Sequence, residues 1–366
     1  MMRVLVDHQA FCLERVGGIT RYHLELARAL AAQQLAHVDF FAGFHRSGLR
    51  KAPHGCGWSG LDLPWMPHTG YPLQVLSSLP LSALPAGRWQ VHHQSYVHPF
   101  RGPSGTARVM THHDCIYERW PDRFGDAGRV IAGRRASLAR ADAVICVSTH
   151  ARDELVQRYQ PDLNRLHVIH HGLTRLPPPA VARPHPRPYL MHVGRRSGYK
   201  DFATVLAAWS SSPCLAREFD LVAFGGGPLT ADEHQMAAMA ARAGGLLQVA
   251  GDDSALSTWY AHAAVVVVPS RAEGFGFPVL EGMAAGVPVL AANATSLPEV
   301  AGAAARLVPP GDPLAWREAL GAVLGDSALE RSLRSAGPRR AAQFTWEKCA
   351  RETAEVYARA SERVRS

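Results

Sequence analysis

The sequence of 366 residues lacks the features that mark membrane-spanning, secreted and disulfide-rich proteins. No stretch approaches the roughly 18 consecutive apolar residues that a membrane-spanning helix needs. The first ten residues hold only a short apolar stretch before Asp7, so the sequence predicts no signal peptide. The six cysteines are scattered and form no Cys-x-x-Cys pair, which favours reduced thiols and argues against a zinc ribbon or a disulfide scaffold. We therefore expect a cytoplasmic protein.

The composition is that of a globular protein with a moderate excess of positive charge. Hydrophobic residues make up 47% and charged residues 19%, which predicts a full core, and the length suggests two domains. Lysine and arginine number 39 against 31 acidic residues, a net charge of +8. That excess suits phosphates, a membrane surface or nucleic acid, and equally a solvated basic surface. The basic residues are dispersed and no nucleic-acid-reading motif accompanies them, so no nucleic-acid partner is expected.

Short apolar runs alternate with helical patterns along most of the chain. In the first half we expect strands at Arg3–Asp7, His37–Phe41, Ala107–Thr111, Ala143–Val147 and Leu166–His170, and helices at Ile19–Gln33, Gly125–Arg140 and Thr149–Tyr159. Six prolines then interrupt the pattern between Leu173 and Pro188, which indicates a linker. After it we expect strands at Tyr189–Val193, Asp220–Phe224, Leu247–Ala250, Val265–Pro269, Val287–Leu290 and Arg306–Val308, with helices between them and from Pro313 to Arg363.

This alternation predicts an α/β protein whose parallel sheets are covered by helices on both faces. Two such series joined by one linker predict two Rossmann-like domains, residues 1–172 and 189–344, with the linker at 173–188 and a cleft between the domains. In sheets of this kind, ligands bind beyond the carboxyl ends of the strands. Those strand ends are therefore where candidate functional residues are sought.

Two segments could face a membrane or an acceptor. The stretch Leu63–Gly87 contains no charged residue and five prolines, which exclude a spanning helix. We expect an irregular insertion packed on the core; an apolar surface facing an acceptor or a membrane is the alternative. A helical stretch farther along carries four arginines that could dock on anionic lipid, or form a solvated face: Arg129, Arg134, Arg135 and Arg140.

The most informative stretch runs from Ser270 to Val300. Glu273 opens a glycine-rich turn, Glu273-Gly-Phe-Gly-Phe-Pro, and a helix is predicted to begin near Pro278. Glu281 follows with seven residues between the two glutamates, so both carboxylates can edge one pocket and accept hydrogen bonds from hydroxyls of a sugar or a ribose. The turn and the helix start supply further candidate ligand-binding residues: Gly274, Phe275, Gly276, Val279 and Leu280. Glycines allow close approach of a ligand, and free amides at a helix N-terminus favour a phosphate.

A second candidate group opens the second domain. Arg195 and Lys200 follow the predicted strand Tyr189–Val193, five residues apart. Two cations at a strand end can neutralise a diphosphate and stabilise it as a leaving group. Arg196 is an alternative to Arg195, because the sequence does not say which side chain faces the ligand.

The stretch after Ser270 looks like the signature of the retaining, GT-B-fold glycosyltransferases of family 4: two glutamates with seven residues between them in an E-G-F-G-x-P-x-x-E context, then a G-x-P-V strand. By this resemblance Glu273 binds hydroxyls of the donor sugar and Glu281 binds the ribose. Arg195 and Lys200 match the family's G-R…K element, which holds the donor diphosphate. The last helix of that fold usually crosses back onto the first domain, which would place residues 345–366 there. The resemblance makes residues 1–172 the acceptor domain and 189–344 the nucleotide-sugar donor domain.

The first domain also resembles the family at two strand ends. Val16-Gly-Gly-Ile-Thr-Arg-Tyr resembles its glycine loop, in which Gly17 and Gly18 would let backbone amides approach the donor phosphate. Thr111-His-His-Asp-Cys resembles a His-Asp element near the donor sugar, which maps to His113 and Asp114. Three His-His pairs, at His92, His112 and His170 with the residue after each, raise the alternative of a metal site, but nothing fixes a third ligand. The family's reaction needs no metal, so no metal and no cofactor are expected.

The resemblance implies transfer of a hexose from a nucleotide diphosphate sugar to a hydroxyl of a glycan or lipid-linked acceptor, with retention at the anomeric carbon. GDP-mannose is the favoured donor and a UDP-sugar the alternative, because the motifs look like enzymes of bacterial surface-polysaccharide assembly. We therefore expect a role in lipopolysaccharide or exopolysaccharide synthesis, with peripheral contact at the inner face of the membrane. The competing hypotheses are a sugar-nucleotide epimerase or hydrolase on the same fold, and a catalytically silent binding module.

Overall fold

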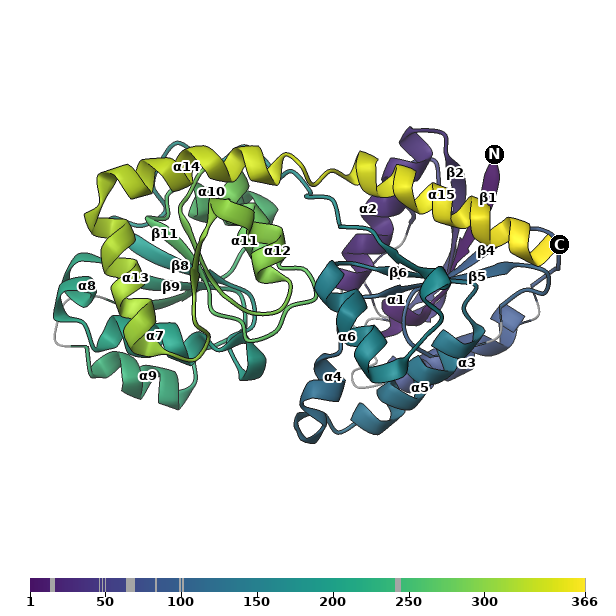
Figure 1. Cartoon of the computed structure of the whole chain (residues 1–366), viewed down its shortest axis with the longest axis horizontal. Helices are drawn as coiled ribbons and strands as arrows, with labels where there is room; N and C mark the ends of the chain where they lie inside the picture. The colour runs from purple at the N-terminus through teal and green to yellow at the C-terminus, as the bar shows by residue number, and fades with distance from the viewer. Residues whose placement is uncertain are drawn as a thin grey trace. The chain divides into compact units, whose positions relative to one another are not determined.

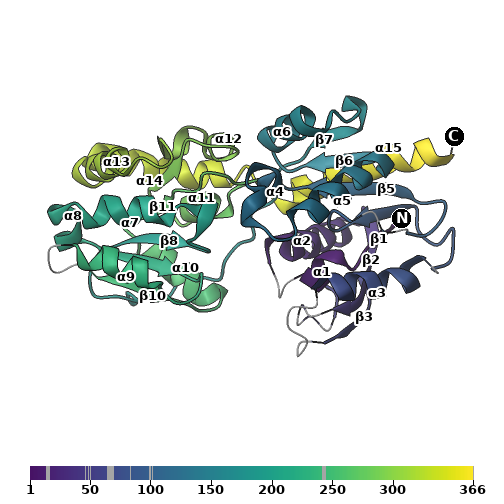
Figure 2. The same cartoon turned by 90° about the horizontal axis from the view of Figure 1, so that it is seen from below.

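The computed structural model of the chain consists of two compact units, residues 1–172 with 345–366, and residues 173–344. It describes residues 1–13, 17–45, 47, 49, 51–63, 70–82, 84–98, 100, 102–240 and 245–365. Each unit is a parallel sheet with helices on its faces (Figures 1 and 2). The predicted α/β class, two Rossmann-like domains, is therefore confirmed. Val16 of the expected glycine loop, Ser366 and residues 64–69 of the uncharged stretch lie outside the described residues.

The first unit contains a seven-stranded sheet in the order β3-β2-β1-β4-β5-β6-β7. Its strands are β1 (Met2–Val6), β2 (Ala36–His45), β3 (Gly57–Asp62), β4 (Val91–Gln94), β5 (Ala107–His112), β6 (Ala143–Cys146) and β7 (Leu166–Val168). Its helices are α1 (Gln9–Leu13), α2 (Gly18–Ala32), α3 (Gly70–Ser82), α4 (Ile116–Arg119), α5 (Ala127–Arg140), α6 (Thr149–Tyr159) and α15 (Trp346–Arg365). Helices α2 and α15 pack on one face, and α3, α5 and α6 contribute to clusters that lie apart from theirs. Helix α15 thus completes the core of the first unit (Figure 1).

The second unit contains a six-stranded sheet in the order β10-β9-β8-β11-β12-β13. Its strands are β8 (Tyr189–Val193), β9 (Asp220–Phe224), β10 (Leu246–Val249), β11 (Val265–Val268), β12 (Val289–Ala292) and β13 (Arg306–Val308). The helices are α7 (Phe202–Ser210), α8 (Pro213–Glu218), α9 (Ala231–Ala238), α10 (Asp253–Ala261), α11 (Phe277–Ala284), α12 (Leu297–Ala301), α13 (Pro313–Gly325) and α14 (Ser327–Ala341). Four consecutive, fully buried valines make β11 a central strand, as β-branched runs favour.

The segment 173–188, expected to be a linker between the domains, makes hydrogen bonds to the second unit. The hydroxyl of Ser257 donates to the carbonyl of Pro177, and the amide of Ala180 donates to Thr258. Near its end, Arg187 forms an ion pair with the buried carboxylate of Asp220 at 3.0 Å. The prolines leave few backbone donors, so side chains of the second unit make most of these contacts.

The expected irregular insertion is a helix instead. Residues 70–82 form α3, in which Pro72 lies in the first turn, where a missing N–H costs no helical hydrogen bond. One side of α3 is buried, with Leu73, Gln74, Ser77 and Leu81 at 3% exposure or less, whereas the opposite side is apolar and exposed: Tyr71, Val75, Leu76 and Leu79. The alternative of an exposed apolar surface therefore remains. Among the described residues, no helix combines the length and apolar character that crossing a membrane requires.

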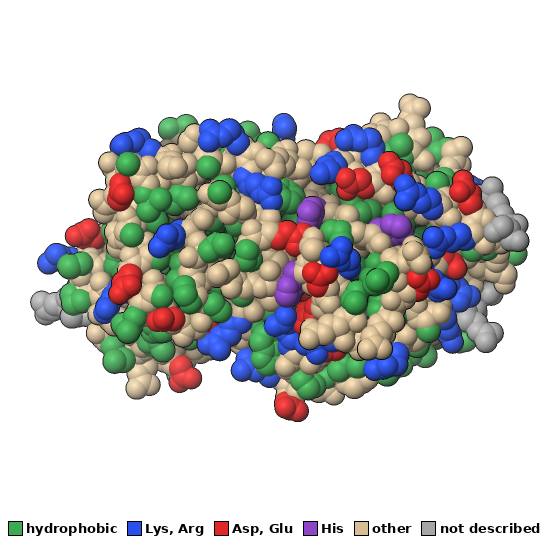
Figure 3. Space-filling view, in the orientation of Figure 1, with side chains coloured by type: hydrophobic (Ala, Val, Ile, Leu, Met, Phe, Trp, Pro, Cys, Tyr) green, Lys and Arg blue, Asp and Glu red, His purple; other side chains and the backbone are tan. Residues whose placement is uncertain are grey.

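The basic stretch on α5 is less uniform than its sequence indicates. Arg134 is 4% exposed and forms an ion pair with Glu118 inside the unit, so it does not belong to a basic surface. Arg129, Arg135 and Arg140 are exposed, and the guanidinium of Arg129 lies 4.1 Å from the ring centre of Tyr71 on α3. On the face shown in Figure 3, Lys and Arg side chains are scattered among acidic and neutral ones.

Candidate functional site

The predicted donor-site residues gather at one edge of the second unit's sheet. The strand order reverses between β8 and β11, which are hydrogen-bonded neighbours at the centre of the sheet. Arg195 and Lys200 follow β8, and Glu273 follows β11. A reversal of strand order leaves a crevice at the carboxyl ends of the two strands, where open α/β sheets bind ligands. The sequence-predicted residues therefore lie where the topology itself favours a ligand.

Lys200 and Glu273 form an ion pair across this edge. Nζ of Lys200 donates to Oε1 of Glu273 at 2.7 Å, and the two side chains are 22% and 12% exposed. The pair brings together two residues that are 73 positions apart in the sequence and that were predicted separately. Its partial exposure keeps the ammonium and the carboxylate accessible to a ligand that carries both a phosphate and hydroxyls.

The glycine-rich turn leads into α11 through one backbone position that only glycine accepts. Gly276 caps α11 with φ +108°, and a Cβ there would lie 2.6 Å from the side chain of Leu297. Phe275 is buried, with its ring against Phe277 and Phe344, so its side chain is part of the core. The expectation that the Val279 amide is free is wrong, because it donates to the carbonyl of Gly276 at 3.0 Å. The Val279 amide is therefore used within the turn and is not free to bind a phosphate.

Glu281 is held by a tyrosine that the sequence interpretation missed. The hydroxyl of Tyr260, on α10, donates to Oε2 of Glu281 at 2.7 Å, and the Tyr260 side chain is fully buried. Burial and the adjacent carboxylate raise the pKa of Tyr260 well above its usual value, so it remains a donor. Glu281 itself is partly exposed. A tyrosine in a helix between two strands gives no sequence signal for this contact.

The two adjacent arginines have different environments. The guanidinium of Arg196 is 4% exposed and donates to Glu233 and to the carbonyls of Gly225, Gly227 and Pro228. It therefore fixes the glycine loop 225–227, whose three residues all have left-handed φ. Arg195 is exposed. The side chain with access to a ligand in solution is that of Arg195.

In the first unit, the predicted glycine pair begins α2. Gly17 is the N-cap of the helix and its carbonyl accepts the amide of Arg21, while Gly18 is exposed and a Cβ there would meet no atom within 4 Å. The amides of the first turn of a helix have no partner within the helix, and the helix dipole favours an anion near them. The local geometry is thus compatible with the predicted phosphate contact.

His113 lies just after β5, beside the rings of Tyr22 and His171, which also contact each other. Its ring centre is 5.4 Å from that of Tyr22 and 5.6 Å from that of His171, and its Nε2 has no hydrogen-bond partner among the described residues. Burial lowers the pKa of His113 to about 3, so the imidazole is neutral near pH 7. Asp114, in contrast, accepts the amide of Ile116 through Oδ1 and thereby starts α4.

Behind His113 lies a buried chain of hydrogen bonds that the sequence interpretation did not find. Tyr357 on α15 contacts Nδ1 of His93 at 2.6 Å, Nε2 of His93 contacts the hydroxyl of Thr111 at 2.9 Å, and Thr111 contacts Tyr22 at 3.0 Å. The paired histidines at the strand ends were the only sequence signal, and on a strand such pairs face opposite sides. Accordingly, His92 contacts Asp7 on the other side of the sheet. Among the described residues, no group of three His, Cys, Asp or Glu side chains is arranged to hold a metal ion.

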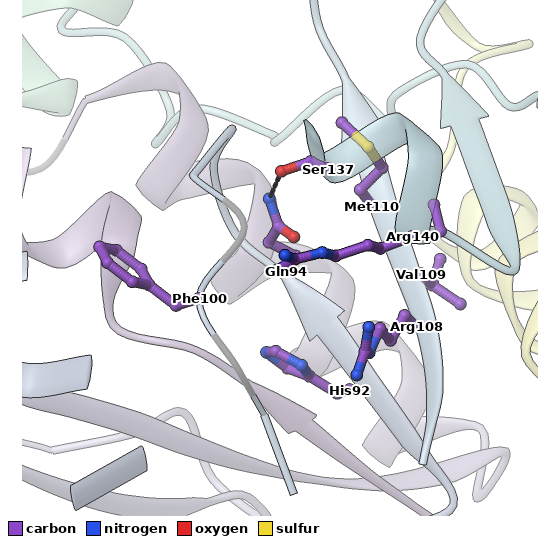
Figure 4. Close-up of a pocket in the computed structure, with 9 residues that line it drawn as sticks. His92, Gln94, Phe100, Arg108, Val109, Met110, Ser137 and Arg140 are labelled. Carbon is purple, nitrogen blue, oxygen red and sulfur yellow. Dashed lines mark hydrogen bonds between the residues drawn. The ribbon is translucent and has the colours of Figure 1, made fainter. Parts of the chain in front are cut away.

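A small pocket of the first unit is separate from the predicted residues. It lies between β4, β5 and α5, with Arg108, Arg140, His92 and Phe100 in its wall (Figure 4). Gln94 donates to the hydroxyl of Ser137 across it at 2.8 Å. The enclosed space accommodates about one water molecule, so this pocket cannot hold a sugar or a nucleotide.

Both units match models of known protein families. Residues 16–175 match the family model described as Glycosyltransferase Family 4, and residues 187–326 match that described as Glycosyl transferases group 1. A D-inositol 3-phosphate glycosyltransferase of Xylanimonas cellulosilytica is 34% identical over 64% of this chain, and the match spans 61% of that relative. The O-antigen chain mannosyltransferase B of Escherichia coli is 41% identical over 29% of this chain and 28% of its own length.

The fold has counterparts among solved structures. The sucrose-phosphate synthase of Thermosynechococcus elongatus superimposes with a TM-score of 0.78 over 98% of this chain and 99% of that one, at 23% identity. Each unit thus carries a glycosyltransferase domain, in the same order along the chain as the two sheets. The chain belongs to the glycosyltransferases that combine a family 4 domain with a group 1 domain on the GT-B fold.

Proposed function

We propose that the chain transfers a hexose from a nucleotide diphosphate sugar to a hydroxyl of a glycan or lipid-linked acceptor, with retention at the anomeric carbon. The observation that carries this proposal is the Lys200–Glu273 pair at the reversal of strand order, with Glu281 on the helix that follows. A cation for the diphosphate and two carboxylates for hydroxyls are the groups that a sugar nucleotide requires.

In this proposal the side chains act through position and charge. Lys200 and Arg195 stabilise the negative charge that develops on the leaving diphosphate, and these fixed cations do so without a metal ion. Glu273 accepts hydrogen bonds from the donor sugar, and Glu281, oriented by Tyr260, accepts them from the ribose. The acceptor hydroxyl oxygen bonds to the anomeric carbon on the face from which the diphosphate leaves, and the leaving phosphate takes the hydroxyl proton. No carboxylate of the chain is assigned as a covalent nucleophile. His113 is assigned to the donor sugar as a neutral imidazole.

The donor remains a choice between two nucleotide classes. The relative named as a mannosyltransferase supports GDP-mannose and with it a role in surface polysaccharide synthesis. A UDP-sugar is the alternative. The relatives differ in the acceptor that their names imply, so we leave the acceptor as a hydroxyl of a glycan or lipid-linked saccharide.

Nucleotide binding and turnover test this function together. Thermal unfolding is measured with GDP, UDP, GDP-mannose and UDP-glucose, for the wild type and Glu281→Gln, which keeps an oxygen that can accept from Tyr260. A ligand at about a hundred times its dissociation constant adds about 2.7 kcal/mol of stability. We expect one nucleotide class to stabilise the wild type, and the effect to be weaker in the variant. A flat response with folded protein would favour the silent module.

Release of the nucleotide separates the enzyme hypotheses. A transferase releases nucleoside diphosphate rapidly only when an acceptor glycan is supplied, whereas a hydrolase releases it from the donor alone. An epimerase converts the donor without releasing the nucleotide. We expect acceptor-dependent release that is lost in Lys200→Met.

We further propose that the exposed side of α3 contacts a lipid surface that carries the acceptor. Val75, Leu76 and Leu79 are 43%, 50% and 68% exposed, α3 has no charged residue, and Arg129 lies beside Tyr71 at its start. Apolar side chains next to a cation suit the interface of an anionic bilayer. Cosedimentation with phosphatidylglycerol vesicles should fall in a Leu76→Ser, Leu79→Ser variant and not in Leu163→Ser, which changes an exposed leucine elsewhere. Equal binding by all three proteins would refute the contact.

A further inference from the structure

Left-handed backbone at residues other than glycine is concentrated around the Lys200–Glu273 pair. Among the described residues of the second unit, two such positions occur, Asp201 with φ +52° and Thr295 with φ +50°. Asp201 follows Lys200 directly, and Thr295 is hydrogen-bonded to Glu273. A β-branched residue in this region is a genuine outlier, and strained residues of this kind gather at functional sites.

Thr295 and Ser296 hold three backbone groups of the turn that carries Glu273. The amide of Glu273 donates to Oγ1 of Thr295 at 2.9 Å. The hydroxyl of Ser296, which is fully buried, lies 2.8 Å from the carbonyl of Glu273 and 3.0 Å from that of Phe275. Two consecutive hydroxyls after β12 therefore fix the main chain on both sides of the Glu273 side chain.

The loop that carries Lys200 is tied to the same turn. The amide of Arg271 donates to the carbonyl of Tyr199 at 2.7 Å, and Nε of Arg271 donates to Oδ2 of Asp201 at 2.9 Å. The hydroxyl of Thr204 donates to the same carboxylate oxygen at 2.9 Å. Each partner of the ion pair is thus fixed by a neighbour whose backbone is strained.

We propose that Thr295 is a positioning residue for sugar recognition: its strained backbone aims Oγ1 at the Glu273 amide and fixes the direction of the Glu273 carboxylate. This inference rests on the proposed function, in which Glu273 binds the sugar and not the nucleotide. The strain persists because the hydroxyl is useful only in that orientation. A glycine would adopt the same backbone without cost and would lose the hydrogen bond.

Three substitutions at Thr295 distinguish the effect of the hydroxyl hydrogen bond from the effect of the backbone strain. Thr295→Val keeps the shape and the branching and removes the acceptor; Thr295→Gly removes both the strain and the acceptor; Thr295→Ser keeps the acceptor. We expect Thr295→Val and Thr295→Gly to bind the cognate sugar nucleotide, UDP-glucose or GDP-mannose, about five- to tenfold more weakly than wild type, the range for one lost hydrogen bond. Thr295→Ser restores affinity to within about twofold. Binding of UDP or GDP alone stays unchanged in all three.

The comparison of sugar nucleotide with nucleotide distinguishes positioning from a general structural role. A general structural defect weakens the binding of nucleotide and of sugar nucleotide alike, and that result would overturn the inference. In a Glu273→Ala background, Thr295→Val should cause no additional loss, since the group that it positions is absent. Additive losses would show that Thr295 acts on the ligand by another route.

Amide exchange tests the inference independently of the proposed function. Hydrogen–deuterium exchange at the Glu273 amide, resolved by NMR on the full chain, should accelerate at least tenfold in Thr295→Val and remain slow in Thr295→Ser. Fast exchange in the wild type would refute the positioning contact. If exchange behaves as expected and the wild type binds neither sugar nucleotide, the proposed function fails, and with it the role in sugar recognition.

Discussion

Tyr260 and Glu281 join helices α10 and α11 in the candidate site. The buried hydroxyl donates to one carboxylate oxygen at 2.7 Å, and Glu281 lies in α11, the helix that Gly276 caps. A phenol fixed by complete burial limits the rotamers of the carboxylate that it binds. In the proposed function, in which Glu281 binds the ribose, a residue outside the recognisable motif therefore sets the geometry of that contact.

Tyr260→Phe removes this hydroxyl and nothing else. We expect the free energy of unfolding to fall by about 1.5–3 kcal/mol, as for a hydrogen bond to a charged group, and the affinity for nucleotide to fall several-fold. Urea unfolding and calorimetric titration measure the two effects. Unchanged nucleotide affinity, together with reduced stability, would show that nucleotide binding by Glu281 does not depend on its hydrogen bond from Tyr260.

We expect substitution by alanine to reduce stability at Arg196 and to reduce turnover at Arg195. Arg196→Ala leaves Glu233 and three carbonyls without their donor, so we expect a loss of about 3–5 kcal/mol in unfolding free energy. Arg195→Ala changes an exposed side chain, so stability should change by less than about 0.5 kcal/mol while turnover falls. Thermal unfolding and a nucleotide-release assay on both variants make the comparison. If Arg195→Ala had full turnover, the assignment of Arg195 to the diphosphate would be wrong.

Acid should destabilise the first unit through its buried histidines. Burial lowers the pKa of His93 to about 3, whereas an unfolded histidine titrates near 6.5. Between these values the unfolded chain binds the proton and the folded chain does not, so stability is full above pH 6.5 and falls as the pH drops toward 3. At pH 5.5 one such histidine costs about 1.4 kcal/mol relative to pH 7.5. Burial lowers the pKa of His23 and His113 as well, which adds loss of the same sign.

His93→Gln isolates this contribution. Glutamine can still contact Tyr357 and Thr111 and does not titrate, so the difference in unfolding free energy between pH 7.5 and 5.5 should be smaller by about 1.4 kcal/mol than in the wild type. The absolute stability of the variant does not matter, because the measured quantity is the slope with pH. An unchanged slope would mean that His93 is protonated in the folded protein.

The sequence predicted the strands that are mostly apolar, including the three-residue strands β7 and β13, and missed strands of mixed composition. Strand β11 is a continuous apolar run, and β8 and β9 are apolar except for His192 and Asp220, whereas β3 and β4 contain glycine, histidine and glutamine and gave no alternation to detect. Helix α3 was missed because its prolines suggested an irregular segment. Of the two prolines within it, Pro72 occupies the first turn, where the missing N–H costs no helical hydrogen bond, and Pro80 lies near the C-terminal end.

At the site, the residue types and spacings were predictable and their partners were not. Lys200 and Glu273 were predicted separately, and the ion pair between them follows from the neighbouring positions of β8 and β11. Tyr260 and Thr295 were not predicted as site residues, because a single hydroxyl contact to another element leaves no pattern in the sequence. The choice between Arg195 and Arg196 depended on which side chain the loop directs inward, which only the three-dimensional structure gives.

Lys200 provides the sharpest test of the chemistry. Lys200→Met keeps the length of the side chain and removes the charge, so transition-state stabilisation should fall by about 2.7–4 kcal/mol, a loss of about a hundred- to a thousandfold in kcat/KM. Lys200→Arg keeps a cation in place of the ammonium and should recover part of the activity. Lys348→Met makes the same chemical change on α15, where the lysine is 54% exposed, and should leave the rate unchanged. A Lys200→Met enzyme as fast as Lys348→Met would mean that the leaving diphosphate is stabilised without this ammonium, and the pair with Glu273 would then be a structural ion pair only.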